Sequence, residues 1–355
     1  MSPDAGGSWS GQDTTPGAIE SALRDLLREQ FARDDAYVPA RVLNLVVVAD
    51  REWRGEVLNR LDRVGRYHAS RTILCAVEPG RSGIDASVAI TADADAVKQE
   101  IALTRERVVL DIGPDHLEML HTIVDPLVVT DLATVVWSPH GHPDAVDALL
   151  DLAQVVLVDS VNEPDPVAAV TRARELAEKA YVVDLAWLRS TPWRERVAAT
   201  FDPPRWREEL ARIDMVRVRH EPDSALAGVL FCGWLASRLG WEPDRLAEGN
   251  GTRRGSARAG EGREVSFELV ADAELQVPGL AGIEIGTSSG MCVSLDRGVG
   301  GLSARRMNRD GHESKWTVLG ASRGESGILG EGIRQALLRD PAYRHALERA
   351  GTMLR

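Results

Sequence analysis

The chain has 355 residues, of which 44% are hydrophobic and 27% charged, and its formal net charge at pH 7 is −12. This composition is typical of a globular protein with enough residues for two domains. The acidic balance argues against a nucleic-acid-binding protein, because contacts with phosphates need a basic face. It also disfavours binding to anionic membranes.

Targeting and redox features indicate a cytoplasmic protein. No apolar run approaches the roughly 18 residues that a membrane-spanning helix needs, and residues 1–16 have no apolar core of a signal peptide. The three cysteines, Cys75, Cys232 and Cys292, are far apart and odd in number. This pattern is typical of a reducing compartment rather than of a disulfide framework.

The first half of the chain alternates between predicted strands and helices. Residues 1–16 are rich in Gly, Ser, Asp and Thr and predict a disordered tail. Helical spacing of apolar residues follows from Pro16 and again from Trp53. Strands are predicted at Arg41–Val48, Thr72–Val77, Ser87–Thr91, Arg107–Ile112, Ala133–Trp137 and Gln154–Val158. The alternation predicts an α/β domain over residues 17–164, with a largely parallel, Rossmann-like sheet and helices on both faces.

Residues 165–355 predict a C-terminal α+β domain. The pattern is mostly helical up to about Leu239, and residues 248–262, with five glycines, predict a flexible loop. A closing helix is predicted at Gly327–Leu347, interrupted at Asp340–Pro341. Short strands joined by Gly-rich turns predict a small antiparallel sheet, at Glu264–Val270, Gly282–Gly286, Met291–Leu295 and Trp316–Leu319.

Motifs for catalysis or cofactor binding are missing from the sequence. The turn after Arg41–Val48 reads Ala-Asp-Arg-Glu-Trp-Arg and has no glycine of a dinucleotide fingerprint. Neither a Walker motif nor a Gly-x-Ser-x-Gly elbow occurs. His140, His142 and Asp144 form the best candidate metal cluster, but a solvated loop is the favoured interpretation. The sequence therefore predicts no catalytic residue, no cofactor, no metal and no enzymatic activity of its own.

Tryptophan and arginine side chains near the ends of predicted elements are the positive signal. Ser70 and Arg71, with His68, precede a predicted strand, where an arginine can bind a carboxylate or phosphate or act structurally. A second cluster lies at helix ends and contains Trp187, Trp193, Arg194 and Trp206. Tryptophan and arginine dominate protein-interface hot spots, although tryptophans at helical spacing also pack cores. Both interpretations are compatible with the sequence.

Five blocks in register resemble one known family. Asp-Leu-Ala-Trp at Asp184–Trp187, followed by Trp193-Arg194, resembles the signature of the glucose-6-phosphate dehydrogenase assembly proteins, the OpcA family. The other blocks are Arg41–Val48, His68–Leu74, Asp131–Pro139 and Gly233–Leu239. The chain departs from the family at Ala69, which replaces a proline, and after Trp137, where a second tryptophan is missing.

The resemblance implies a non-catalytic helper in the oxidative pentose phosphate pathway. Such a protein binds glucose-6-phosphate dehydrogenase as its partner and promotes its assembly or its active oligomer, as an allosteric activator. Residues in the family blocks are then the expected partner-binding residues: His68, Ser70, Arg71, Trp137, Asp184, Trp187, Trp193 and Arg194.

Three other hypotheses compete with the helper. One is a sensor or enzyme that binds a sugar phosphate or nucleotide at the Arg71 end of the sheet. Another is a self-assembling structural protein that ignores the dehydrogenase. The departures from the family pattern, together with the long arginine-bearing loop around Arg253, also allow a diverged paralogue that serves a different dehydrogenase isoform or none.

Overall fold

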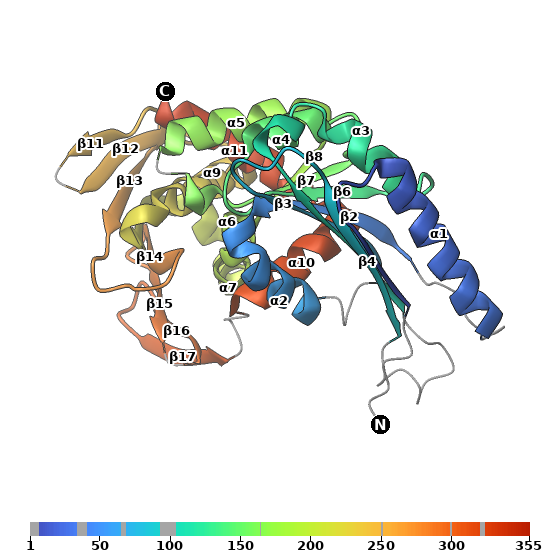
Figure 1. The fold of residues 1–355 in the computed structure, drawn as a ribbon. Helices are drawn as coiled ribbons and strands as arrows, with labels where there is room; N and C mark the ends of the chain where they lie inside the picture. Colours follow the sequence, from blue (N-terminus) through green and yellow to red (C-terminus); the bar gives the residue numbers. More distant parts are fainter. Residues whose placement is uncertain are drawn as a thin grey trace. The chain divides into compact units, whose positions relative to one another are not determined.

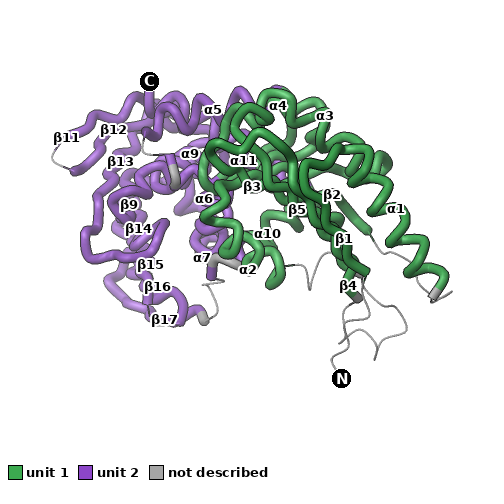
Figure 2. Tube along the Cα trace, viewed as in Figure 1, with its two compact units in different colours: residues 1–158, 179–183, 329–338 green, residues 159–178, 184–328, 339–355 purple. Residues whose placement is uncertain are grey.

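The protein folds into two compact units (Figure 2). The structure is a computed structural model and describes residues 7–33, 41–64, 69–92, 104–163, 165–249, 251–298, 300–319 and 324–355. Unit 1 comprises residues 1–158, 179–183 and 329–338, and unit 2 comprises 159–178, 184–328 and 339–355. The first crossing, at Val158, lies near the predicted boundary at residue 164. The return of two later segments to unit 1 was not predicted.

An eight-stranded, largely parallel sheet forms unit 1, with its strands in the order β1-β4-β5-β3-β2-β6-β7-β8 (Figure 1). Neighbours from β5 through β3, β2 and β6 to β7 pair in parallel. The β1–β4 and β4–β5 pairs are antiparallel. The strands are β1 (Ser8–Gly11), β2 (Leu43–Asp50), β3 (Ser70–Val77), β4 (Asp85–Ala92), β5 (Thr104–Ile112), β6 (Thr134–Trp137), β7 (Val155–Val158) and β8 (Tyr181–Asp184). The predicted Rossmann-like sheet is confirmed.

The central strand β2 shows why this sheet is covered on both faces. Its sequence LNLVVVAD is buried at every position except the last, and such a continuous apolar run is typical of a parallel strand with helices on either side. Figure 1 shows α1, α3 and α4 on one side of the strands and α2 with α10 on the other. These helices are α1 (Pro16–Arg33), α2 (Arg54–Val64), α3 (Leu120–Val124), α4 (Pro143–Leu149) and α10 (Gly324–Leu338).

Strand order places a topological switch point between β2 and β6. The chain runs outward from β2 through β3 to β5, and then returns to the other side of β2 to build β6, β7 and β8. This is the order of a doubly wound dinucleotide-binding sheet, in which ligands bind at the carboxyl ends of the strands beside the switch point. The segments that follow β2 and β6 are therefore the first place to look for a site in unit 1.

A nine-stranded, mostly antiparallel sheet forms the frame of unit 2. Its main path is β10-β12-β13-β9-β14-β15-β16-β17, with β11 paired to β12. One pair, β13 with β9, is parallel. The strands are β9 (Ile213–His220), β10 (Glu242–Pro243), β11 (Ala247–Gly249), β12 (Thr252–Arg258), β13 (Glu264–Ala271), β14 (Leu280–Thr287), β15 (Cys292–Gly298), β16 (Gly301–Met307) and β17 (Glu313–Leu319).

One face of this second sheet packs on helices. In β9, Val216 and Val218 are fully buried while Arg217 between them is exposed, which is the alternation expected of a strand with one solvated face. Helix α9 packs on β9 and β13, and α11 packs on α9. The helices are α5 (Pro166–Lys179), α6 (Leu185–Arg189), α7 (Thr191–Phe201), α8 (Pro204–Arg207), α9 (Ala225–Leu239) and α11 (Ala342–Leu354).

Two segments differ from their sequence-based predictions. Ser8–Gly11, inside the predicted disordered tail, pairs antiparallel with Ala86–Ala89 of β4. The predicted flexible loop at 248–262 contains the β11–β12 hairpin, because Arg253 and Arg254 find cross-strand partners. No helix in the described parts of the chain combines the length and the apolar character that a bilayer crossing requires.

Candidate functional site

The residues expected to bind a partner are split between the two units. Ser70, Arg71 and Trp137 belong to unit 1, whereas Asp184, Trp187, Trp193 and Arg194 belong to unit 2. His68, the remaining candidate, lies outside the described residues. Four of the eight candidates thus lie in unit 2, three lie in unit 1, and one is outside the described residues.

Arg71 at the start of β3 is a buried, ion-paired arginine. Its Nε donates to Glu106 Oε2 on β5 at 2.7 Å, and its Nη1 donates to the carbonyl oxygen of Leu127 at 2.9 Å. Arg41 also donates to the Glu106 carboxylate. The Arg71 residue is 7% exposed, and burial lowers its pKa although Glu106 raises it. In the isolated chain this guanidinium holds the amino end of the parallel sheet together.

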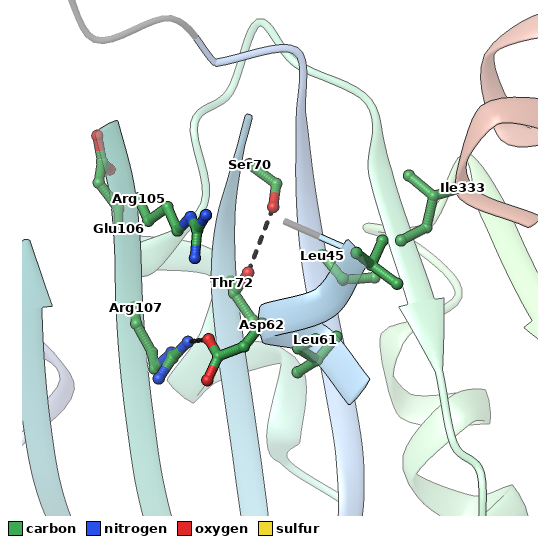
Figure 3. Close-up of a pocket in the computed structure, with 10 residues that line it drawn as sticks. Leu45, Leu61, Asp62, Ser70, Thr72, Arg105, Glu106, Arg107 and Ile333 are labelled. Atoms are coloured by element: carbon green, nitrogen blue, oxygen red, sulfur yellow. Dashed lines mark hydrogen bonds and ion pairs between the residues drawn. The ribbon is translucent and has the colours of Figure 1, made fainter. Parts of the chain in front are cut away.

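The opposite face of the same strand ends forms a small polar pocket (Figure 3). Ser70 and Thr72 of β3 lie beside Arg105 and Arg107 of β5, and Arg107 is ion-paired with Asp62 of α2. The pocket has room for about 20 Å³ of solvent, which is enough for a single water molecule. A sugar phosphate at this end of the sheet would need the arginine side chains to move. This pocket therefore gives no support to a sugar-phosphate site at this end of the sheet.

In unit 2, Asp184 is a fully buried carboxylate that caps α6. It accepts hydrogen bonds from the backbone N–H groups of Ala186 at 2.9 Å and Ser160 at 3.1 Å. The hydroxyl of Tyr343 on α11 donates to its other oxygen at 3.1 Å. Burial, aided by the nearby Asp159 carboxylate, raises the Asp184 pKa to about 6, even though the backbone donors act in the other direction.

Arg194 of α7 stacks on the Trp187 ring at 3.3 Å from its centroid. Its guanidinium also donates to Ser190 Oγ at 3.1 Å, to the Trp187 carbonyl at 3.2 Å and to Thr191 Oγ1 at 2.8 Å. Burial lowers the pKa of Arg194 to about 9. The Trp187 ring also meets the Tyr343 ring, with the two ring centroids 5.7 Å apart. Asp184, Trp187 and Arg194 thus form, with Tyr343, one contact network that joins α6, α7 and α11.

Burial sets the role that these side chains have in the isolated chain. Trp137, Trp187 and Trp193 are 1%, 3% and 2% exposed, and Arg194 is 8% exposed. In this state they form the interior of their units and not an open surface. Their contact with a partner stays a prediction, and exposed neighbours are the side chains that a partner would meet first.

The switch point of unit 1 holds an interlocked cluster of side chains. Asp50, the last residue of β2, lies 3.0 Å from Nε2 of His142. Trp53 of the short helix η1 (Arg51–Trp53) stacks on His140, with the ring centroids 4.8 Å apart. Glu56 lies 3.7 Å from Nε2 of His140. Within the described ranges, no group of three or more His, Cys, Asp or Glu side chains is placed to hold a metal ion. The loops after β2 and β6 are instead bound to each other.

Charged groups farther along this edge also pair internally. Glu78, which follows β3, accepts hydrogen bonds from Arg51 at 2.9 Å and from Arg81 at 2.7 Å. Arg54 reaches both oxygens of Asp111, at 3.1 and 3.0 Å. The bond from Arg81 is the main reason that the Glu78 pKa is lowered. Many dinucleotide-binding sheets hold a ribose with a carboxylate that follows the second parallel strand, which is β3 in this chain. Here the carboxylate at that position, Glu78, is already bound to Arg51 and Arg81.

Sequence reasoning did not identify several residues of these networks. Glu106 is flanked by two arginines just before an apolar run. A charged residue at the start of a buried parallel strand could have indicated an ion pair with a neighbouring strand. Tyr343, 159 positions from Asp184, has no local signal at all. A third group, around Arg306, becomes visible only because β16 brings it beside Trp206.

Two models of one family match the chain. The model described as the glucose-6-phosphate dehydrogenase subunit N-terminal domain matches residues 62–175, and that of the C-terminal domain matches residues 180–347. Both are OpcA domain models. The chain belongs to the OpcA family.

Relatives with the same family name support this membership. A putative OxPP cycle protein OpcA of Synechococcus elongatus is 28% identical over 244 residues, covering 67% of this chain and 53% of that protein. A protein of the same name in Nostoc punctiforme is 33% identical over 131 residues, covering 36% of this chain and 28% of that protein. The chain thus spans about half the length, or less, of these relatives.

Solved structures share the fold. An oxidoreductase from Sinorhizobium meliloti matches with a TM-score of 0.53 at 12% identity, covering 88% of this chain and 95% of that chain. Levoglucosan dehydrogenase, in complex with NADH and L-sorbose, matches with a TM-score of 0.50 at 13% identity, covering 88% of this chain and 96% of that chain. At such identities the likeness concerns the fold alone.

Proposed function

We propose that this protein is a non-catalytic helper that binds glucose-6-phosphate dehydrogenase and promotes its assembly or its active oligomeric state. The observation that carries the proposal is the pair of family models, described as domains of a glucose-6-phosphate dehydrogenase subunit, which match 62–175 and 180–347. Relatives named as proteins of the OxPP cycle agree with a role in the oxidative pentose phosphate pathway.

The switch point supports a helper rather than a second dehydrogenase. A dinucleotide fingerprint needs glycines after the first strand so that the backbone can approach the pyrophosphate. In this chain the turn carries Asp50 and Trp53 instead, and both are engaged with histidines from the loop after β6. Binding a dinucleotide there would require breaking the Asp50–His142 contact and the stack of Trp53 on His140.

Linkage explains how a helper without an active site can raise activity. A partner that binds the active oligomer more tightly than the inactive form shifts the equilibrium by its differential affinity. A tenfold preference needs about 1.4 kcal/mol. A few well-packed side chains at an interface supply that amount. The helper therefore needs a surface that recognises one oligomeric state, and needs no catalytic group.

Mixing experiments test the binding step. The purified chain is combined with the glucose-6-phosphate dehydrogenase of the same organism, and the mass is measured by light scattering, with an unrelated dehydrogenase as the control. We expect a heavier species only with the cognate enzyme. Titration calorimetry of the chain with glucose 6-phosphate and with NADP addresses the small-molecule alternative. Saturable binding of either ligand without any complex would contradict the helper and favour a metabolite sensor.

A further inference from the structure

Two arginines converge on one tryptophan at the surface of unit 2. The guanidinium of Arg306, on β16, lies 4.6 Å from the ring centroid of Trp206 on α8, and that of Arg205 lies 5.2 Å from the same centroid. Arg306 also lies 5.8 Å from the ring of Trp316 on β17. Arg205 is exposed, whereas Arg306 and both tryptophans are half-buried. We refer to Arg205, Trp206, Arg306 and Trp316 as the Arg–Trp cluster.

The positive charges of this cluster are not compensated within the described residues. No carboxylate oxygen of those residues lies within ion-pair distance of Arg205 or Arg306. The pKa of Arg306 is lowered by burial and by the like charge of Arg205, with no acidic neighbour acting against them. By contrast, Arg217 and Arg254 of the sheet that contains Arg306 are both ion-paired with Glu268. The chain has a net charge of −12, yet these two neighbouring arginines have no acidic partner among the described residues.

Both arginines lie within cation–π distance of Trp206. Because no carboxylate among the described residues occupies their N–H groups, these groups are available to bind a carboxylate in bidentate geometry. The indole nitrogen of Trp206 is buried and has no acceptor among the residues that the structure describes, so packing holds the ring rather than a hydrogen bond. Tryptophan and arginine together are the residue types that dominate interface hot spots.

We infer that the Arg–Trp cluster is the docking point for an acidic segment of the partner protein. Carboxylates of that segment bind Arg205 and Arg306, and its apolar side chains pack on Trp206. A protein surface fits better than a small anion, because at an exposed site water screens a small anion, whereas a docked protein excludes water around the pairs. This inference rests on the proposed function and names the surface through which the dehydrogenase is held.

Charge reversal tests the inference on the 355-residue chain. The affinity for the dehydrogenase is measured for wild type and for the Arg205→Glu/Arg306→Glu double variant. We expect the dissociation constant to rise at least tenfold, and the remaining binding to depend less on salt. Arg258→Glu is the matched control, because this exposed arginine of the same sheet is 3.4 Å from its own partner, Glu242. The control should change the dissociation constant by less than threefold.

A second variant separates shape from charge. Arg205→Lys/Arg306→Lys keeps both charges but loses the planar fork, so we expect an intermediate loss of affinity. If wild type binds and the double reversal binds equally well, the docking point is wrong while the helper function stands. If wild type does not bind the dehydrogenase, the helper function fails and the docking inference fails with it. Circular dichroism and thermal melts matching wild type show that the variants are folded.

Discussion

At the scale of single residues, Asp184 joins three elements and carries a pH dependence. Its folded pKa of about 6 lies above the ordinary 3.8, so the folded state holds this proton more tightly than the unfolded chain does. Its contribution to stability is therefore fully present below about pH 4 and is lost as the pH rises through 6. By 1.36 kcal/mol per pKa unit, the loss is on the order of 3 kcal/mol.

Asp184→Asn removes this titration. The side-chain oxygen of asparagine can still accept the two backbone hydrogen bonds, so we expect a folded protein whose stability falls less than that of wild type between pH 4 and pH 7. Urea unfolding at several pH values gives the free energy of unfolding of both proteins. A lost hydrogen bond shifts the free energy of unfolding by the same amount at every pH. The informative result is therefore the difference between the two proteins in how this free energy changes with pH. Parallel curves would contradict a raised Asp184 pKa.

Substitution of Arg71 is expected to lower the stability of the fold, whether or not Arg71 contributes to binding. Arg71→Met leaves the buried Glu106 carboxylate with Arg41 as its remaining cation, and breaking a buried ion pair costs about 3–5 kcal/mol. Arg107→Met, on the neighbouring strand β5, is the control, because the Arg107–Asp62 pair is partly exposed and its loss should cost about 1 kcal/mol or less. Equal free energies of unfolding for the two variants would show that the Arg71–Glu106 pair is not structural.

At the scale of elements, the packing of α9 against α11 depends on one glycine. A Cβ added at Gly233 would lie 2.5 Å from the carbonyl oxygen of Ala346 and 3.1 Å from the backbone nitrogen of Ala350. Because the clashing atoms belong to the backbone of α11, the helices must separate to accept it. The close packing of α11 therefore explains why the Gly-Trp-Leu-Ala block of α9 begins with a glycine.

Gly233→Ala is expected to destabilise the protein by about 1–3 kcal/mol through overpacking. Gly17→Ala in α1 is the matched change, because nothing lies within 4 Å of the added Cβ there. That control should raise stability by up to about 1 kcal/mol, since alanine favours helix and restricts the unfolded chain. Thermal denaturation of the two variants gives both values. A Gly233→Ala variant that is as stable as the Gly17→Ala variant would rule out the close approach of the helices.

Elements whose pattern matches their environment could be predicted from the sequence. The apolar run of β2 and the alternating Val265, Phe267 and Leu269 of β13 carry their own signal. β1 does not, because Ser-Trp-Ser-Gly becomes a strand only through backbone pairing with β4. Buried and exposed residues alternate along β9. It was not predicted as a strand, because its outer positions are charged and the segments on either side of it are helical. Its parallel partner β13 lies far away in the chain, and such pairing leaves no local trace.

The candidate site was less predictable than the fold. Sequence reasoning found the family blocks, but it could not separate residues that touch a partner from residues that hold the helices bearing them. Trp187 and Arg194 belong to the residue types that dominate interface hot spots. Their contact with each other, at 3.3 Å, is visible only in the tertiary structure. The Arg–Trp cluster depends on β16 reaching α8, which no local pattern encodes.

At the scale of the whole molecule, the chain keeps a doubly wound, Rossmann-like sheet, and the segments at its switch point contact each other through their own side chains. Asp50, Trp53, His140 and His142 lie where doubly wound sheets bind a dinucleotide. Family membership and these contacts agree with the proposal of a protein that acts through a surface. Fold alone does not determine function, so the decisive evidence is the effect on the partner enzyme.

The most direct test is the specific activity of glucose-6-phosphate dehydrogenase as a function of helper concentration. The enzyme is held at a concentration low enough for its oligomer to dissociate, and its mass is followed in the same samples. We predict a saturable rise in specific activity that tracks the appearance of the heavier complex. Specific activity that stays constant up to a saturating excess of helper, with the complex formed, would contradict the central claim.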